Sequence, residues 1–165
     1  MKRLAACMIS MVILTGCGSG GSPGATYAVG ACGLTKASGS GDWIAPPLTP
    51  SETKWDIGSP LWELEEASEG WASRAVDATR AAREDSRYVN LRDTTTAISG
   101  MRNSVVSWAG SNPGKHAQLS TLLPSDPFLQ QGLAVEERLT GSPSYNSLLQ
   151  TWKVECNVVA DELNG

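Results

Sequence analysis

The sequence predicts an all-α fold, a small antiparallel bundle of about four helices that follows an irregular Pro/Gly-rich N-terminal arm. Long segments after residue 59 carry apolar residues at alternating spacings of three and four, the spacing of one buried helix face. Ser-Pro or Asp-Pro pairs precede three of these segments, and such pairs are typical of helix starts. We therefore expect an irregular arm at residues 27–58 and a helical domain at residues 59–165.

The first part of the helical domain, over residues 60–109, carries two stripes, each a row of mostly apolar residues on the expected buried face of a helix. Ser59 is expected to cap the first helix, with Pro60 at its first position. One helix over the whole range would have about 50 residues, far above the usual length. We expect a break near Asp85 and Ser86, because either residue can cap a new helix. The first stripe comprises Leu61, Leu64, Ser68, Trp71, Ala75, Ala78 and Ala82, and the second Tyr88, Leu91, Thr95, Ile98, Met101, Val105 and Trp108.

Breaker residues separate the remaining helices. A short helix is predicted over residues 115–123, after the Gly/Pro-containing residues 110–114. A longer helix is expected from Asp126 and Pro127 to Gly141, and the last one opens at Ser142 and Pro143. The last stripe is the clearest in the chain and comprises Tyr145, Leu148, Leu149, Trp152, Cys156, Val159 and Leu163.

The arm is expected to lack regular structure over residues 35–58. Residues 27–34 are interpreted as one short extended segment around Cys32. The prolines at residues 46, 47 and 50 favour extended backbone, because proline fixes φ and disfavours the helix at the preceding residue. Trp43 and Trp55 are expected to hold the arm on the core, and the alternative is an exposed aromatic recognition arm.

The N-terminus has the three-part pattern of an export signal. Lys2 and Arg3 precede eleven mostly apolar residues, and a helix over residues 4–15 would cover roughly 18 Å of the about 30 Å of bilayer hydrocarbon. The signal ends in Leu14-Thr15-Gly16-Cys17, which resembles a bacterial lipobox. The resemblance covers the first 17 residues and leaves open an ordinary secretory signal with an incidental cysteine.

The resemblance implies that Cys17 receives a diacylglyceryl group and becomes the mature N-terminus after residues 1–16 are removed. Two acyl chains are enough for stable anchoring. Residues 17–26 are then a flexible Gly/Ser tether. The mature chain of 149 residues has 11 basic and 17 acidic residues, a net charge of −6, and has no basic tract. This composition argues against a nucleic-acid partner. It also gives no electrostatic attraction to anionic lipid headgroups, so membrane association is expected to depend on the lipid at Cys17.

Two of the four cysteines remain after this processing. Cys7 leaves with the signal and Cys17 carries the lipid, so Cys32 and Cys156 form the expected disulfide in an exported protein. They lie 124 residues apart, and the chain-entropy model gives such a link about 4 to 5 kcal/mol of stabilisation. The alternative is two separate buried thiols.

Candidate catalytic and metal-binding residues are few. His116 is the only histidine, and it is interpreted as an ordinary surface residue without a nucleophile motif beside it. The acidic residues Glu63, Glu65, Glu66 and Glu69 are interpreted as a solvated helix face, since they spread around the helix. Glu136 and Glu137 are adjacent and point in different directions, which disfavours a carboxylate pair. No metal or cofactor is expected.

The sequence therefore favours a membrane-anchored cell-envelope lipoprotein, outside the cytoplasm, that binds another envelope protein without catalysis. Trp71, Trp108 and Trp152 lie on three different stripes, and we expect them to meet in one core. Their alternative role is to line a cleft for a small apolar or glycan ligand, which would make the protein a carrier or sensor. Two weaker alternatives are an envelope hydrolase that uses His116 and a phage-derived lipoprotein that blocks superinfection.

Overall fold

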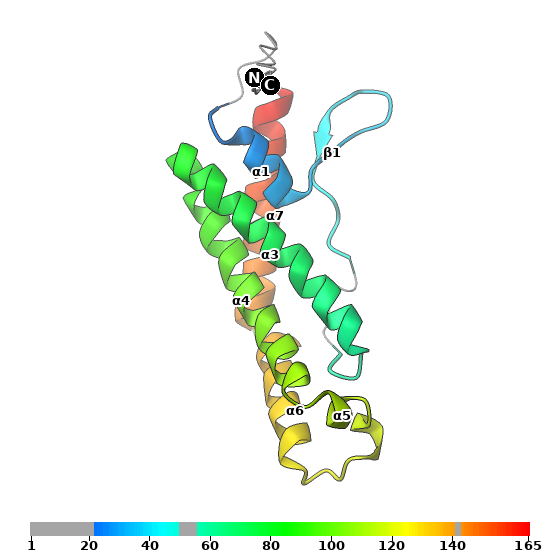
Figure 1. Cartoon of the computed structure of the whole chain (residues 1–165). Coiled ribbons are helices and arrows are strands. Elements are labelled where there is room, and N and C mark those ends of the chain that lie inside the picture. The colour runs from blue at the N-terminus through cyan, green and yellow to red at the C-terminus, as the bar shows by residue number, and fades with distance from the viewer. Residues whose placement is uncertain (1–21, 50–55, 141–142) are drawn as a thin grey trace, which may run out of the picture.

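A computed structural model describes residues 22–49, 56–140 and 143–165. This part of the chain is mostly helical, as predicted, with six α-helices and one two-stranded sheet (Figure 1). The four long helices are α3 (Leu61–Glu84), α4 (Val89–Ser111), α6 (Pro127–Thr140) and α7 (Pro143–Asn164). The lipobox with Cys17, the tether up to residue 21, Trp55 and Ser142 lie outside the described residues.

The first helix, α1 (Ala25–Cys32), corrects the expected extended segment and shortens the expected tether. Gly24 and Gly33 flank it with φ values of 92° and 62°, which glycine adopts without strain. The small side chains of Ala28 and Ala31 are fully buried, and α1 lies against α3 and α7. Eight residues are too few for a stable isolated helix. Packing against these neighbours, which local sequence does not reveal, is therefore what favours the helix.

The rest of the arm contains a small hairpin, which corrects the expected absence of regular structure over residues 35–58. Strands β1 (Thr35–Lys36) and β2 (Trp43–Ile44) are antiparallel, with Thr35 opposite Ile44 and Lys36 opposite Trp43. The Asn164 side chain at the end of α7 exchanges two hydrogen bonds with the Trp43 backbone, at 2.7 and 2.9 Å. The hairpin is therefore held against the last helix, and Trp43 packs against the core as expected.

The predicted break between the two stripes is confirmed. Asp85 ends α3, and its carboxylate accepts a hydrogen bond from the Arg87 backbone N–H in a single 3-10 turn, Ser86–Tyr88. The start of α3 differs by one residue from the prediction, because Pro60 occupies the N-cap position and Leu61 begins the helix. Ser59 instead closes a turn, with its backbone N–H bonded to the Asp56 carbonyl.

The chain between α4 and α6 forms a short helix, α5 (Pro113–His116), and a 3-10 turn at Leu119–Thr121. The predicted single helix over residues 115–123 is thus divided and begins earlier. Asp126 caps α6 as expected, since its carboxylate accepts the Phe128 backbone N–H at 2.9 Å. The last helix begins at Pro143, as predicted.

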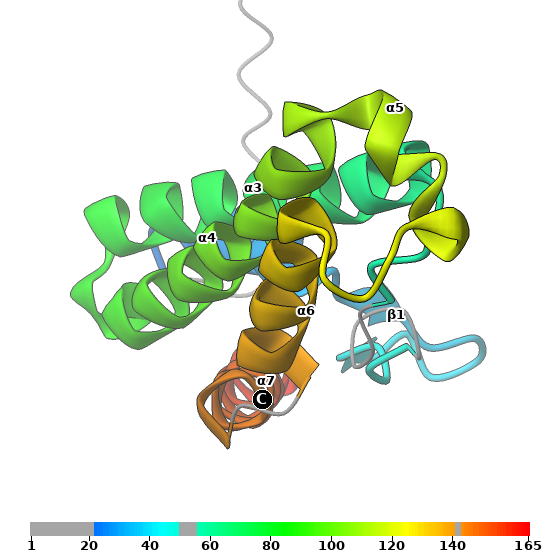
Figure 2. The ribbon, with the colours of Figure 1, turned by 90° about the horizontal axis from the view of Figure 1, so that it is seen from below.

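Helix α4 lies at the centre of the arrangement. It contacts α3, α6 and α7, and α1 fits between α3 and α7 (Figure 1). Viewed from below, α6 passes beneath α4 and leads to α7, which is seen end on (Figure 2). The predicted cysteine pair is present as a disulfide with a Cα–Cα distance of 5.3 Å. It joins α1 to the middle of α7 across 124 residues.

Candidate functional site

The tryptophans of the three stripes all belong to one hydrophobic core, as predicted. Trp71 on α3 and Trp152 on α7 meet edge to face with ring centroids 5.1 Å apart. Trp108 on α4 stacks on Phe128 at 4.7 Å and meets His116 at 5.6 Å. The three rings thus form two separate contact groups, and each is filled by neighbouring side chains.

Two arginines complete the group around Trp71 and Trp152. The Arg74 guanidinium lies 4.8 Å from the Trp71 ring centroid and 5.0 Å from that of Trp152, within cation–π range. Arg102 on α4 is only 1% exposed; its Nε donates to the Tyr145 hydroxyl at 2.7 Å, and its guanidinium lies 5.5 Å from the Trp71 centroid. The cluster therefore connects α3, α4 and α7.

Sequence reasoning did not identify Arg102 as a buried residue. Its position fits the stripe of α4, since it lies four residues after Ile98 and three before Val105. Met101 fits the stripe nearly as well and has an apolar side chain, but it is only half-buried. The sequence does carry a signal for the burial of Arg102. It is an arginine at a position of the buried stripe, where it can contact an aromatic residue on a facing helix.

His116 is buried, at 7% exposure, which corrects its interpretation as a surface residue. Its Nε2 lies 3.0 Å from the Ile57 carbonyl oxygen. A carbonyl oxygen only accepts hydrogen bonds, so Nε2 carries the proton. Ile57 is also held through its backbone N–H, which donates a hydrogen bond to Glu136. The histidine therefore fixes the turn that precedes α3.

Glu136 has an unusual environment for a carboxylate. Burial raises its pKa, the nearby Asp56 carboxylate raises it further, and the hydrogen bond from Ile57 acts in the opposite direction. Glu137, its neighbour on α6, points to solvent. The two carboxylates consequently do not form a pair, as expected from their adjacent positions on a helix.

The acidic residues at the start of α3 are exposed, as the solvated-face interpretation predicted: Glu63, Glu65, Glu66 and Glu69. Within the described ranges, no group of three or more His, Cys, Asp or Glu side chains is placed to hold a metal ion. None of the helices in these ranges has the length and apolar character needed to cross a membrane.

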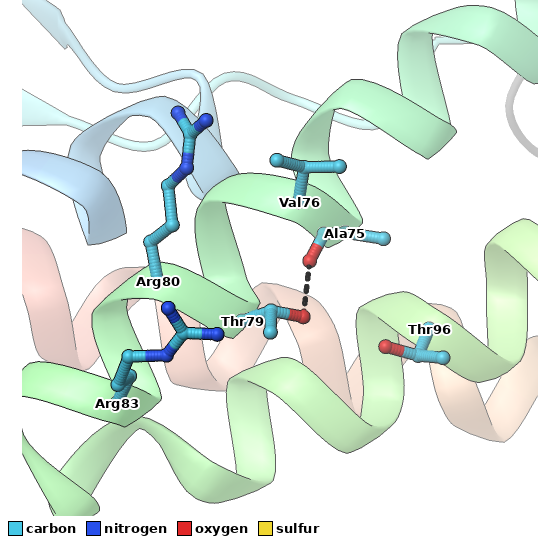
Figure 3. A pocket seen from close by; sticks show the side chains of 6 residues that line it. All are labelled: Ala75, Val76, Thr79, Arg80, Arg83 and Thr96. Atoms are coloured by element: carbon cyan, nitrogen blue, oxygen red, sulfur yellow. Dashed lines mark hydrogen bonds between the residues drawn. The ribbon is translucent and has the colours of Figure 1, made fainter.

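Two hollows lie on the surface between α3 and α4, and charged side chains line both. The first has a volume of about 330 Å³ and is lined by Ala75, Val76, Thr79, Arg80, Arg83 and Thr96. Figure 3 shows Arg80 extending toward α1 and the Arg83 guanidinium extending toward Thr79, with Thr96 opposite on α4. The Arg80 guanidinium lies 3.6 Å from Asp77 and over the Tyr27 ring, so Arg83 is the cation that faces this hollow.

The second hollow lies nearer the start of α3. It has a volume of about 300 Å³ and is lined by Glu65, Ser68, Glu69, Ala72, Asn103 and Val106. The α3 residues of both hollows recur at spacings of three and four, so they lie on one helix face. We call the two hollows together the α3–α4 groove. The side chains between the two ends of the groove are mostly small or weakly polar, and the two ends carry opposite charges.

The charged residues of this groove have few partners of their own. Glu65, Glu69 and Arg83 are exposed and make no ion pair or side-chain hydrogen bond with any residue that the structure describes. Val76, midway between the ends, is 51% exposed. The groove can therefore bind a ligand that is apolar in its middle and carries charges of opposite sign at its ends.

Comparisons with protein-family models, curated proteins and solved structures found no match to this chain.

Proposed function

We propose that the chain is a lipid-anchored envelope protein that acts by binding a protein partner through the α3–α4 groove, without catalysis. The observation that carries the binding part is the groove itself, which is exposed and has Glu65 and Glu69 at one end and Arg83 at the other. Charges of opposite sign at the two ends of a surface set the orientation of a partner.

The disulfide supports the location outside the cytoplasm. Disulfides persist in oxidising compartments, and the Cys32–Cys156 bridge leaves Cys17 as the one cysteine after the signal that is available for lipid. A Gly/Ser-rich segment of only a few residues between Cys17 and Ser22 would keep the domain near the bilayer. We further propose that α3, α4 and the successive helices α6 and α7 act as one antiparallel bundle that presents the groove.

The packing of the candidate ligand and catalytic residues favours this function over its alternatives. The Trp71 and Trp152 rings contact each other and the Arg74 guanidinium, as side chains in a packed core do. His116 is buried and uses Nε2 to hold the Ile57 carbonyl. Both arrangements support structural roles.

The anchor is tested by fractionating cells that express the full chain. We expect the wild-type protein in the membrane fraction and Cys17→Ser in the soluble fraction, because the variant cannot receive the diacylglyceryl group. Cys7→Ser is the matched control, since Cys7 precedes the expected cleavage site and should leave anchoring unchanged. Equal membrane binding of wild type and Cys17→Ser would show the anchor to be wrong.

The binding surface is tested separately by photo-crosslinking in intact cells. A photoreactive residue at Ala72 lies in the groove, and one at Val158 lies on the exposed face of α7 and serves as the control. We expect a discrete crosslinked product from position 72 that is absent from position 158. A product from neither position, or from both equally, would contradict binding through the groove.

A further inference from the structure

The charges on the outer face of α3 are arranged symmetrically about Val76. Glu69 lies seven residues before Val76 and Arg83 seven residues after it. Seven residues correspond to about 10 Å along a helix and to nearly two full turns, so all three side chains lie on one face. The face is thus acidic on one side of its centre and basic on the other, at equal distances.

The helix dipole accounts for only half of this pattern, because Arg83 lies in the last turn of α3, where a basic residue is favoured, and Glu69 does not lie in the first turn. Acidic residues stabilise a helix only in its first turn, and Glu69 is the ninth residue of α3. Glu65 and Glu69 are four residues apart on the same face, where two like charges destabilise a helix. Arg83 has no partner among the described residues. A cation near Glu69 would relieve its repulsion with Glu65, and an anion near Arg83 would supply the partner that Arg83 lacks.

We propose that this face binds a second copy of the chain, with the two α3 helices antiparallel and crossing near Val76. A two-fold axis at Val76 places Glu69 of each copy opposite Arg83 of the other, because the two residues are equally far from the centre. Val76 and the small Ala72 occupy the middle, and their size allows the two helices to approach closely. The interface pairs Glu69 with Arg83 twice and requires no other protein. Arg80, four residues after Val76, keeps its own partner Asp77 at 3.6 Å, and Glu65 lies beyond the two facing pairs.

This dimer deepens the proposed function, on which it rests, by naming the partner of the groove as a second copy. One pair of 24-residue helices gives an interface at the small end of the range for specific complexes. Anchoring two copies in one membrane raises their effective concentration and favours such a contact. The dimer should also weaken as salt increases, since the facing charges lie at the surface.

The test uses the full anchored chain in cells and a single introduced cysteine. Val76→Cys places a thiol at the two-fold axis, where the same residue of two copies meets. Val158→Cys is the matched control, because Val158 is 49% exposed and Val76 is 51% exposed. Mild oxidation should convert Val76→Cys to a product of twice the monomer mass and leave Val158→Cys monomeric.

Charge reversal in the Val76→Cys chain then tests the antiparallel arrangement. Glu69→Arg alone and Arg83→Glu alone each place like charges opposite one another, and two-fold symmetry makes each substitution count twice. We expect each to lower the crosslinked fraction about ten-fold. The double variant Glu69→Arg/Arg83→Glu restores both facing pairs and should recover crosslinking.

The outcomes separate this inference from the proposed function. Crosslinking that is no greater at position 76 than at position 158, or a double variant that does not recover, would overturn the dimer. A mixed disulfide between Val76→Cys and a protein of a different mass would overturn the second copy as partner and retain the groove as a binding surface. The Cys17→Ser fractionation tests the anchor, whereas the comparison of positions 76 and 158 in the anchored chain tests the dimer.

Discussion

The two ends of α4 are stabilised in different ways. Near its start is the clamped end, where α1 packs on α3 and α7 through small side chains and the Cys32–Cys156 bridge. Near its finish is the aromatic end, where Trp108 stacks on Phe128 and contacts His116. At the aromatic end Trp108 also donates its indole N–H to the Phe128 carbonyl at 2.9 Å.

The difference follows from distance along the chain. The contacts of Trp108 join residues within about 25 positions of each other, so closing that loop costs little conformational entropy. The clamped end joins α1 to a helix more than a hundred residues away. A covalent link has its largest effect on such a long loop. A short helix at the far end of a chain therefore depends on a crosslink in a way that the aromatic end does not.

Removal of the disulfide should have the largest effect. We expect Cys32→Ala/Cys156→Ala to lose about 4 kcal/mol of unfolding free energy, measured by denaturant titration. Hydrogen exchange should show lost protection in α1 and retained protection in the middle of α6. Reductant should destabilise the wild type and leave the double variant unchanged. Equal loss of protection at both ends would contradict the distinction between them.

A methyl group at Gly132 should disrupt the aromatic end. A Cβ built there overlaps Trp108 Cζ2, so Gly132→Ala forces the indole to move. Such overpacking costs about 1 to 3 kcal/mol, although alanine in a helix is otherwise favoured over glycine by about 1 kcal/mol. Gly100→Ala is the matched control, because nothing lies within 4 Å of its added Cβ. Thermal unfolding should show opposite signs for the two variants.

Acid should weaken both ends, by the smallest amount of the three changes. Hydrogen bonds from Arg87 lower the pKa of Asp85 to about 2, and the Lys115 ammonium lowers the pKa of Asp126. A folded-state pKa below the unfolded value gives stability that is present above about pH 4. For Asp85 this contribution is lost as the pH falls through about 2.

We therefore expect Asp85→Asn to flatten the dependence of the melting temperature on pH between 5 and 2. The carboxylate of Asp161 is exposed and has no side-chain partner among the described residues, so Asp161→Asn should keep the wild-type slope. Identical slopes for all three proteins would show that the Asp85–Arg87 contact contributes nothing.

The long helices could be predicted because their signals are local. Asp126 caps α6, and Asp85 ends one helix and opens the next turn, both through bonds to nearby backbone groups. The short helix α1 and the burial of His116 could not be predicted, since each depends on residues far away in sequence. The groove was missed for a similar reason: it needs α3 and α4 side by side, although each charge in it was visible.

By itself, the sequence determined the helical class, the positions of the long helices and the cysteine pair. Apolar spacing, capping residues and cysteine count act within a few positions or by simple elimination, so they need no knowledge of the fold. Only the tertiary structure decided that Arg102 is buried beside Trp71 and that the helix face with Glu65, Glu69 and Arg83 stays open. Those facts depend on which helix faces which, and that is set by the packing of the whole core.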